Sequence, residues 1–240
     1  MPLLLPQVHI SFEPEQKNDA PLLVLGGRAP SLPWLRSVAS DRIVWAADRG
    51  ANACMAAGIV PNHVLGDFDS ISQEGEAWLR RIGPEVERFP AEKDHTDFQL
   101  CLKRLEGGLL VTGCWGGRFD HAFANVFSAL WALEWGVKVL AFADESEVLI
   151  PLEAGGQSAA LELRLLSDVS AISLLPLCGV CEGVEVRGTK WELTGATLVQ
   201  GRPYAVSNVP AGEKVSVKIE KGILGVYCFF ETDLRYIEPQ

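Results

Sequence analysis

The residues best suited to chemistry are aspartates that follow short apolar runs of the chain. Asp67 and Asp69 come directly after the run at residues 63–65, and Asp97 lies beyond the run at residues 86–89. Residues two apart in extended backbone point to the same side, so Asp67 and Asp69 are expected to direct two carboxylates at one point. Two anions held together need a cation, and oxygen ligands favour Mg²⁺ in the presence of a nucleotide. A solvated acidic turn is the alternative for this DxD pattern taken alone.

A second group of residues is suited to contact phosphate oxygens. Gly116, Gly117 and Arg118 follow the apolar run at residues 109–114 and combine bare backbone with a guanidinium. Close backbone approach and bidentate hydrogen bonds are what phosphate oxygens require. The same residues also fit a glycine-rich turn with a salt-bridged Arg118.

Asp97 has a further explanation besides metal binding. Thr96 is expected to cap a helix that starts at Asp97 and continues with an apolar stripe from Phe98. The helix dipole favours a carboxylate at this position whether or not the carboxylate binds a metal. Asp97 alone therefore does not identify a metal site.

The elements expected to position these residues form a mostly parallel sheet. From about residue 21 to 150, short apolar runs alternate with stretches of helical periodicity, which is typical of a doubly wound, Rossmann-like α/β domain. Ligands of such sheets bind beyond the carboxyl ends of the strands, where the polar groups lie. We expect strands at residues 21–25, 43–47, 63–65, 86–89, 109–114 and 137–142.

The pattern changes near residue 153 to a period of two. Val215, Val217 and Ile219 alternate with polar residues, and turn residues recur at short intervals, which is typical of an all-β sandwich or barrel. We therefore expect three parts: an N-terminal extension (1–20), an α/β domain that binds nucleotide and Mg²⁺ (21–152), and a β domain (153–240).

Composition narrows the class of protein. The formal net charge of −10 argues against nucleic-acid binding, because phosphate backbones are held by dense Lys and Arg patches. No run approaches the ~20 apolar residues of a membrane helix, and the opening residues lack the basic region of a signal peptide, so we expect a cytoplasmic protein. Its six cysteines are expected to be reduced, and the isolated pair Cys178 and Cys181 lacks the further ligands of a zinc site.

Four segments in this order resemble those of the thiamin diphosphokinases, also called thiamin pyrophosphokinases. They are residues 47–52 (ADRGAN), 66–71 (GDFDSI), 93–97 (KDHTD) and 117–121 (GRFDH). Residues 188–191 (GTKW) and 207–208 (SN) resemble the thiamin-side signatures of the same family. The resemblance covers nearly the whole chain except roughly the first twenty residues.

The resemblance implies an ATP-dependent transfer of diphosphate to the hydroxyethyl oxygen of thiamin, which releases AMP and thiamin diphosphate. It also implies a homodimer, with the active site between the α/β domain of one subunit and the β domain of the other. The implied Mg²⁺ ligands are Asp67, Asp69 and Asp97, which together with Arg118 and Asp120 make up the catalytic set. The implied nucleotide-binding residues are Asp48, Arg49, Gly50, Asn52, Asp94, Thr96, Gly117 and Arg118. The implied substrate-binding residues are Trp191, Ser207, Asn208, Asp120 and His121, with Trp191 stacked on the thiamin pyrimidine.

Three points go beyond the resemblance or depart from it. Many family members have Gly at the position of Arg49, so Arg49 would be strained if that glycine needs a positive φ. Asp120 is hypothesised to orient or deprotonate the alcohol, because it lies beside Arg118. Trp191 also fits a core position of a β domain.

Two other functions stay open at this point. The first is a related diphosphokinase that acts on a pterin alcohol, and the second is a non-catalytic Mg-nucleotide sensor, since binding residues alone do not prove turnover.

Overall fold

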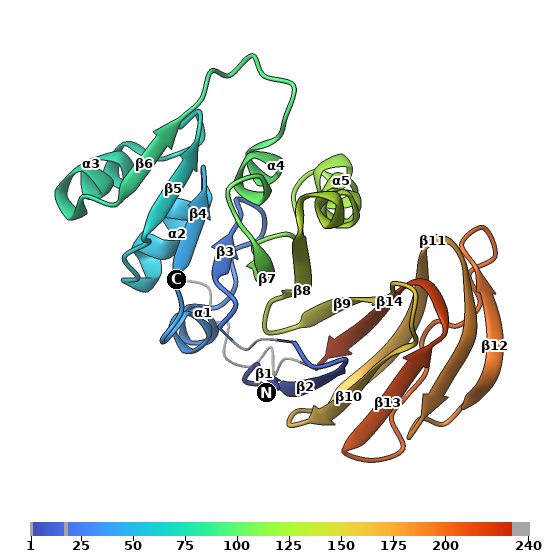
Figure 1. Cartoon of the computed structure of the whole chain (residues 1–240). Helices are drawn as coiled ribbons and strands as arrows, with labels where there is room; N and C mark the ends of the chain where they lie inside the picture. Colours follow the sequence, from blue (N-terminus) through green and yellow to red (C-terminus); the bar gives the residue numbers. More distant parts are fainter. Residues whose placement is uncertain (1, 17–18, 232–240) are drawn as a thin grey trace. The chain divides into compact units, whose positions relative to one another are not determined.

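The computed structural model describes residues 2–16 and 19–231, which fall in two compact units. Residues 17–144 form an α/β unit, and residues 1–16 together with 145–240 form a β unit (Figure 1). A β-rich fold of two units therefore agrees with the expected fold class.

The unit boundaries differ from those expected. The division falls between residues 144 and 145 rather than near 153, and the first sixteen residues are part of the β unit rather than an extension. The reason is strand pairing across a long sequence separation: β2 (Val8–Glu13) pairs antiparallel with β10 (Ala159–Leu165) and buries Val8 and Ile10. Residues 1, 17, 18 and 232–240 of the expected parts lie outside the described residues.

The α/β unit contains a parallel sheet in the order β8-β7-β3-β4-β5-β6. Its strands lie close to the six expected ranges: β3 (Leu22–Val24), β4 (Val44–Ala47), β5 (His63–Gly66), β6 (Glu85–Arg88), β7 (Gly107–Thr112) and β8 (Val137–Ala143). The helices between them are α1 (Leu32–Ala39), α2 (Gly50–Ala57), α3 (Gln73–Ile82), α4 (Asp97–Leu102), α5 (Phe119–Trp131) and the 3₁₀ helix η1 (Ala132–Trp135).

The strand order explains where a ligand can bind. From β3 the chain moves outward through β4, β5 and β6, and it then returns to the other side of β3 to form β7 and β8 (Figure 1). The connections after β3 and β7 therefore run to strands on opposite sides of the β3–β7 pair, and ligands of such sheets bind beyond the carboxyl ends of the strands at this point.

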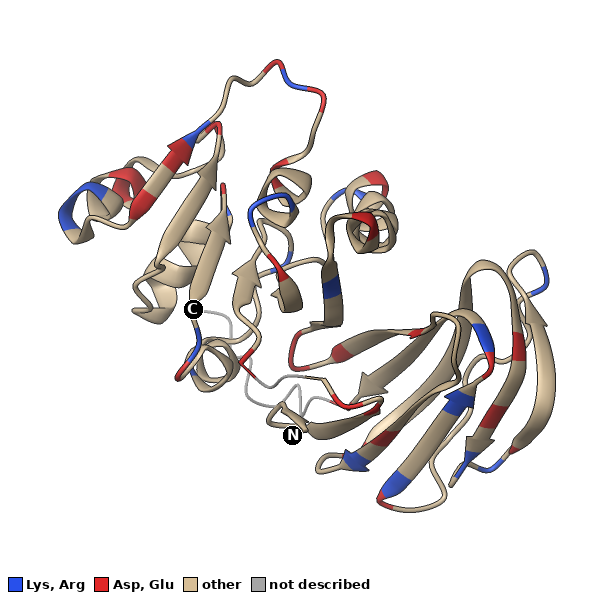
Figure 2. Cartoon of the chain, viewed as in Figure 1, with Lys and Arg blue, Asp and Glu red and all other residues tan. Residues whose placement is uncertain are grey.

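Local sequence signals fix several helix ends in the α/β unit. Thr96 caps α4 as expected: its Oγ1 accepts the Gln99 N–H at 3.2 Å, and Gln99 Oε1 accepts the Thr96 N–H at 3.1 Å. α3 has acidic residues in its first turn and arginines in its last turn, as Figure 2 shows, which complements its dipole. No helix in the described part of the chain is long and apolar enough to cross a membrane.

The β unit is antiparallel, in the order β1-β2-β10-β13-β11-β14-β9 with β12 paired to β11. The alternation expected for β13 is confirmed, because Val215, Val217 and Ile219 are all buried. The remaining strands are β1 (Leu3–Leu4), β9 (Glu147–Ala154), β11 (Val169–Arg187), β12 (Leu193–Val199), β13 (Lys214–Ile219) and β14 (Lys221–Phe230).

The cysteines are free thiols, and only Cys178 is exposed. Burial raises the pKa of Cys54 and of Cys228 to about 12, and it raises the pKa of Cys181 as well. Since the thiolate is the reactive form, a disulfide-exchange reagent should modify one thiol rapidly in the native protein and all six after unfolding. The Cys178→Ser protein should show no rapid phase, and a rapid phase that persists in it would contradict this assignment.

Candidate active site

Three aspartates meet at the carboxyl ends of the sheet. Asp48 follows β4, Asp67 follows β5 and Asp97 begins α4, and one carboxylate oxygen of each lies within 4.8 Å of the others. They line a cleft of about 680 Å³ in the α/β unit. Three carboxylates this close together repel one another, so the site favours a cation.

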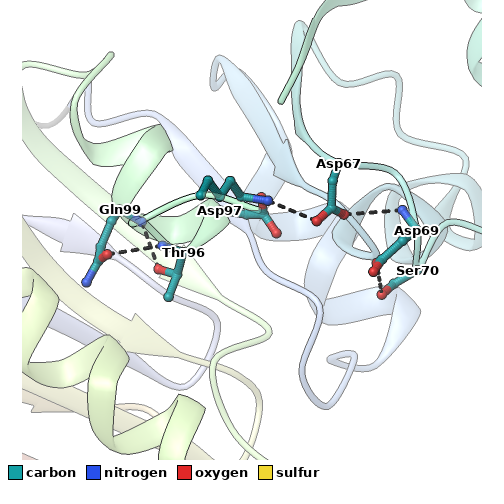
Figure 3. A network of polar contacts seen from close by, with 7 residues as sticks. Asp67, Asp69, Ser70, Thr96, Asp97 and Gln99 are labelled. Atoms are coloured by element: carbon teal, nitrogen blue, oxygen red, sulfur yellow. Dashed lines mark hydrogen bonds and ion pairs between the residues drawn. The ribbon is translucent and has the colours of Figure 1, made fainter. Parts of the chain in front are cut away.

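The group differs from the expected set in one member: it contains Asp48, and it does not contain Asp69, whose role as a ligand stays a prediction. The cause is the backbone at Phe68, which has a φ of +69° and is therefore not extended. The rule that residues two apart point to one side does not apply through such a residue. Asp69 still lines the cleft, but its side chain is exposed and Oδ1 accepts a hydrogen bond from Ser70 Oγ at 2.7 Å (Figure 3).

Lys93 joins two members of the acidic group. Its Nζ lies 2.9 Å from Asp67 Oδ2 and 3.1 Å from Asp97 Oδ1, and its side chain is only 14% exposed. Figure 3 shows the labelled Asp67 and Asp97 near each other, with a dashed line that ends on a carboxylate oxygen of Asp67. Lys93 belongs to the segment at residues 93–97 but had no predicted role, although its spacing of four residues from Asp97 is a signal for such a pair.

The environment moves the pKa values of the three aspartates in different directions. Burial raises the pKa of Asp48 and that of Asp97, in the second case against the opposing effect of Lys93. The hydrogen bond from Lys93 holds the pKa of Asp67 below its usual range. The site thus holds buried carboxylates whose charged forms need a nearby positive charge.

The donor set fits a divalent cation such as Mg²⁺. Asp48 Oδ1 is buried and accepts no hydrogen bond from the described part of the chain, so it has lone pairs available to a ligand. Carboxylate oxygens are the protein ligands that Mg²⁺ prefers, and it usually takes one or two of them together with phosphate oxygens and waters. A buried carboxylate oxygen without a partner costs free energy unless a cation binds it.

The strain considered for Arg49, on the condition that this position needs a positive φ, is absent. Its φ is −56°, in the right-handed region, and the positive φ falls on Asp48 at +44°. Aspartate tolerates this left-handed region better than most residues. Arg49 Nε donates to the carbonyl oxygen of Gly26 at 2.8 Å, so the arginine ties the loop after β3 to the start of α2.

Closely packed glycine loops line the cleft. A Cβ on Gly27 would lie 2.5 Å from the Gly113 carbonyl oxygen, and one on Gly113 would lie 2.3 Å from the Leu25 carbonyl oxygen. Gly26 and Gly27 line the cleft but were missed in the sequence analysis, although a glycine pair directly after a strand is a recognisable signal. Only glycine allows these backbones to approach so closely.

Arg118 and Asp120 form an exposed ion pair at the start of α5. Arg118 Nε lies 3.1 Å from Asp120 Oδ1, and the Nη2 nitrogen contacts Oδ2. Arg118 and the neighbouring His121 line the cleft, whereas Asp120 does not. The hydrogen bond from Arg118 holds the pKa of Asp120 below its usual range, which makes Asp120 a weaker base.

The other expected nucleotide-binding residues divide between the cleft and its surroundings. Asn52 lies outside the cleft, and its Oδ1 accepts a hydrogen bond from Ser72 Oγ at 3.1 Å, so it supports the loop after Asp69. Gly50 is buried and Asp94 is exposed, and neither lines the cleft. The expected residues that do line it are Asp48, Arg49, Asp67, Asp69, Thr96, Asp97, Gly117, Arg118 and His121.

The expected substrate residues of the β unit form a second group. The Trp191 side chain is 56% exposed, which excludes the core position considered for it. Asn208 Oδ1 accepts the Trp191 N–H at 3.1 Å, and Asn208 Nδ2 donates to the Trp191 carbonyl oxygen at 2.7 Å and to Thr189 Oγ1 at 3.1 Å. Ser207 precedes this asparagine with a φ of +58°. Asn208 therefore fixes the backbone that presents the indole ring to solvent.

Comparison with known proteins gives the class and the family. The family model "Thiamin pyrophosphokinase, catalytic domain" matches residues 35–141, and "Thiamin pyrophosphokinase, vitamin B1 binding domain" matches residues 162–224. The glycine-lined cleft with its carboxylates, taken with these matches, defines the chain as an enzyme of the diphosphotransferase class. The chain belongs to the thiamin pyrophosphokinase family, and its function is that of a thiamin diphosphokinase.

Individual relatives agree over most of their length. Thiamine pyrophosphokinase of Bacillus subtilis (strain 168) is 24% identical over 208 residues, which cover 84% of this chain and 94% of the relative. Thiamine pyrophosphokinase 2 of Oryza sativa subsp. japonica is 26% identical over 92% of this chain and 90% of the relative. The crystal structure of the Bacillus subtilis protein superposes with a TM-score of 0.76 at 20% identity, over 89% of this chain and 100% of that one. The yeast thiamin pyrophosphokinase structure superposes with a TM-score of 0.69 at 17% identity, over 93% of this chain and 90% of that one. These structures support the fold alone.

Proposed function

We propose that this enzyme transfers a diphosphate group from ATP to the hydroxyethyl oxygen of thiamin in a Mg²⁺-dependent reaction, which gives thiamin diphosphate and AMP. The observation that supports this most directly is the meeting of Asp48, Asp67 and Asp97 within 4.8 Å in a glycine-lined cleft. Phosphoryl transfer asks a protein mainly for positioning and charge neutralisation, and both are available in this cleft.

Asp48, Asp67 and Asp97 are the residues that would hold the cation, with Asp69 near them in the cleft. When bound, Mg²⁺ supplies positive charge to phosphate oxygens. The chain itself contributes the glycine loops around Gly27 and Gly117, whose bare backbone lets phosphates approach closely. Arg49 and Arg118 line the same cleft and add guanidinium donors.

For Asp120 we favour orientation over proton removal. An aspartate whose pKa is lowered by Arg118 is a poor general base for an alcohol. Asp120 instead restricts the rotamers of Arg118, the residue of this pair that faces the cleft. Its replacement should therefore affect substrate positioning more than the pH dependence of the rate.

The β unit is proposed to bind thiamin. The exposed Trp191 ring offers a surface for stacking the pyrimidine, and Asn208, which follows Ser207, hydrogen-bonds the Trp191 backbone. The match of residues 162–224 to a vitamin B1 binding domain favours thiamin over a pterin as the acceptor.

Several finer assignments rest on the family resemblance. We propose a cytoplasmic homodimer with the active site at the subunit interface. We also interpret the α/β unit as doubly wound and Rossmann-like, because the strand order reverses at β3, and the β unit as a sandwich.

The decisive test is a product assay with Mg²⁺, ATP and thiamin, with a pterin alcohol, or with no acceptor. We expect thiamin diphosphate and AMP in equal amounts when thiamin is the acceptor. We expect no AMP with the pterin alcohol or without an acceptor. AMP formation with the pterin alone would support the pterin alternative, and nucleotide binding without any turnover would support a sensor.

A further inference from the structure

The acidic cluster already contains a cation of its own. Lys93 Nζ contacts Asp67 at 2.9 Å and Asp97 at 3.1 Å, and the three side chains are between 14% and 26% exposed. This partial burial separates the group from the exposed ion pairs of the chain, such as Lys214 with Glu162, where both side chains are at least half exposed. Partly buried pairs are screened less by water and salt, so their charges interact more strongly.

The charges are unequal in number. When Asp48, Asp67 and Asp97 are ionised, the single ammonium of Lys93 leaves two negative charges without a match in the cluster. One divalent cation would match them. That cation must bind within a few ångströms of an ammonium that already occupies Asp67 Oδ2 and Asp97 Oδ1, so Lys93 repels it and competes for its ligands.

We propose that Lys93 is the resident counter-cation of the acidic cluster: it stabilises the metal-free site and lowers the affinity of that site for a divalent cation alone. This inference rests on the proposed function only in taking the cluster as the metal site. A nucleotide brings phosphate charge next to the ammonium and gives it another partner. Metal and nucleotide therefore bind more tightly together than separately, and the metal-free enzyme does not collect cations without substrate.

The central test is a calorimetric titration of Mn²⁺ into the metal-free enzyme and its Lys93→Met variant. Removing the ammonium should tighten binding of Mn²⁺ alone by roughly tenfold, because a positive charge next to the cation is lost. It should also lower the metal-free Tm by roughly 4 to 8 °C, because the carboxylates lose their partner. With α,β-methylene-ATP present, the difference in Mn²⁺ affinity between the two proteins should shrink.

Three further proteins make the test decisive. Lys93→Arg keeps the charge and should bind Mn²⁺ alone as weakly as the wild type. Lys93→Gln replaces Lys93→Met if the latter folds poorly. Lys214→Met removes the exposed ammonium of the β unit and should change neither Tm nor Mn²⁺ affinity.

The outcomes separate this inference from the proposed function. Unchanged or weaker Mn²⁺ binding by Lys93→Met, or tighter binding by Lys93→Arg, would overturn the inference even if the wild type makes thiamin diphosphate. Tighter Mn²⁺ binding by Lys93→Met together with an inactive wild type would support the inference and count against the proposed function.

Discussion

The Asp48→Asn enzyme is expected to form thiamin diphosphate with a kcat/KM about 10³-fold below that of the wild type, the scale seen when a main electrostatic group of a phosphate or acyl site is lost. Asp48 is buried beside Asp67 and Asp97, and its Oδ1 accepts no hydrogen bond from the described part of the chain, so it is available to a cation. An amide offers a weaker ligand and no negative charge. The measurement is steady-state formation of thiamin diphosphate at saturating and at limiting Mg²⁺.

The Asp69→Asn enzyme is the matched control for this prediction. The Asp69 carboxylate is exposed and accepts a hydrogen bond from Ser70. Its loss should lower kcat/KM roughly tenfold, as for a residue that supports a site from outside. Metal-free stability gives a second readout: because burial raises the pKa of Asp48, the neutral amide should leave Tm unchanged or higher. A much larger loss of kcat/KM in Asp69→Asn than in Asp48→Asn would contradict this prediction. It would show that Asp69, rather than Asp48, binds the cation together with Asp67 and Asp97.

The Trp191→Ala enzyme is expected to bind thiamin roughly 10- to 100-fold more weakly, the range found when an aromatic platform for a stacked base is removed. Nucleotide affinity should not change, because the nucleotide residues are in the α/β unit. Folding should also be unaffected, since the indole is more than half exposed and its backbone is fixed by Asn208. Isothermal titration with thiamin and with α,β-methylene-ATP measures the two affinities separately.

Two variants control for a general effect on the β unit. Trp191→Phe keeps an aromatic face and should retain most of the affinity for thiamin. Phe229→Ala removes another exposed aromatic ring of the unit, on β14, and should leave thiamin binding unchanged. Equal losses in Trp191→Ala and Phe229→Ala would indicate unfolding rather than loss of a stacking surface.

Local patterns were sufficient for much of the fold. The six parallel strands, the alternation of β13 and the N-cap at Thr96 all depend on residues within or next to one element. The periods of helix and strand are local properties of the backbone, and a cap involves residues only three apart. The sequence also contained the segments that define the family, because these are contiguous.

What the sequence did not reveal depends on backbone geometry and on contacts between distant segments. Extended backbone was assumed for the segment from Asp67 to Asp69, but Phe68 has a positive φ. The carboxylates that lie within 4.8 Å of one another are those of Asp48, Asp67 and Asp97. The pairing of β2 with β10 spans most of the chain, and no local pattern encodes it.

The sequence by itself determined which residue types are available to the enzyme and which family it belongs to, because motifs and periodicity are carried by neighbouring residues. Only the tertiary structure decided which carboxylates meet, that Lys93 is already paired with two of them, and that Arg49 binds the Gly26 carbonyl without strain. The physical reason is that charge interactions depend on distance in space, and a change of the backbone φ at one residue alters which side chains lie close together.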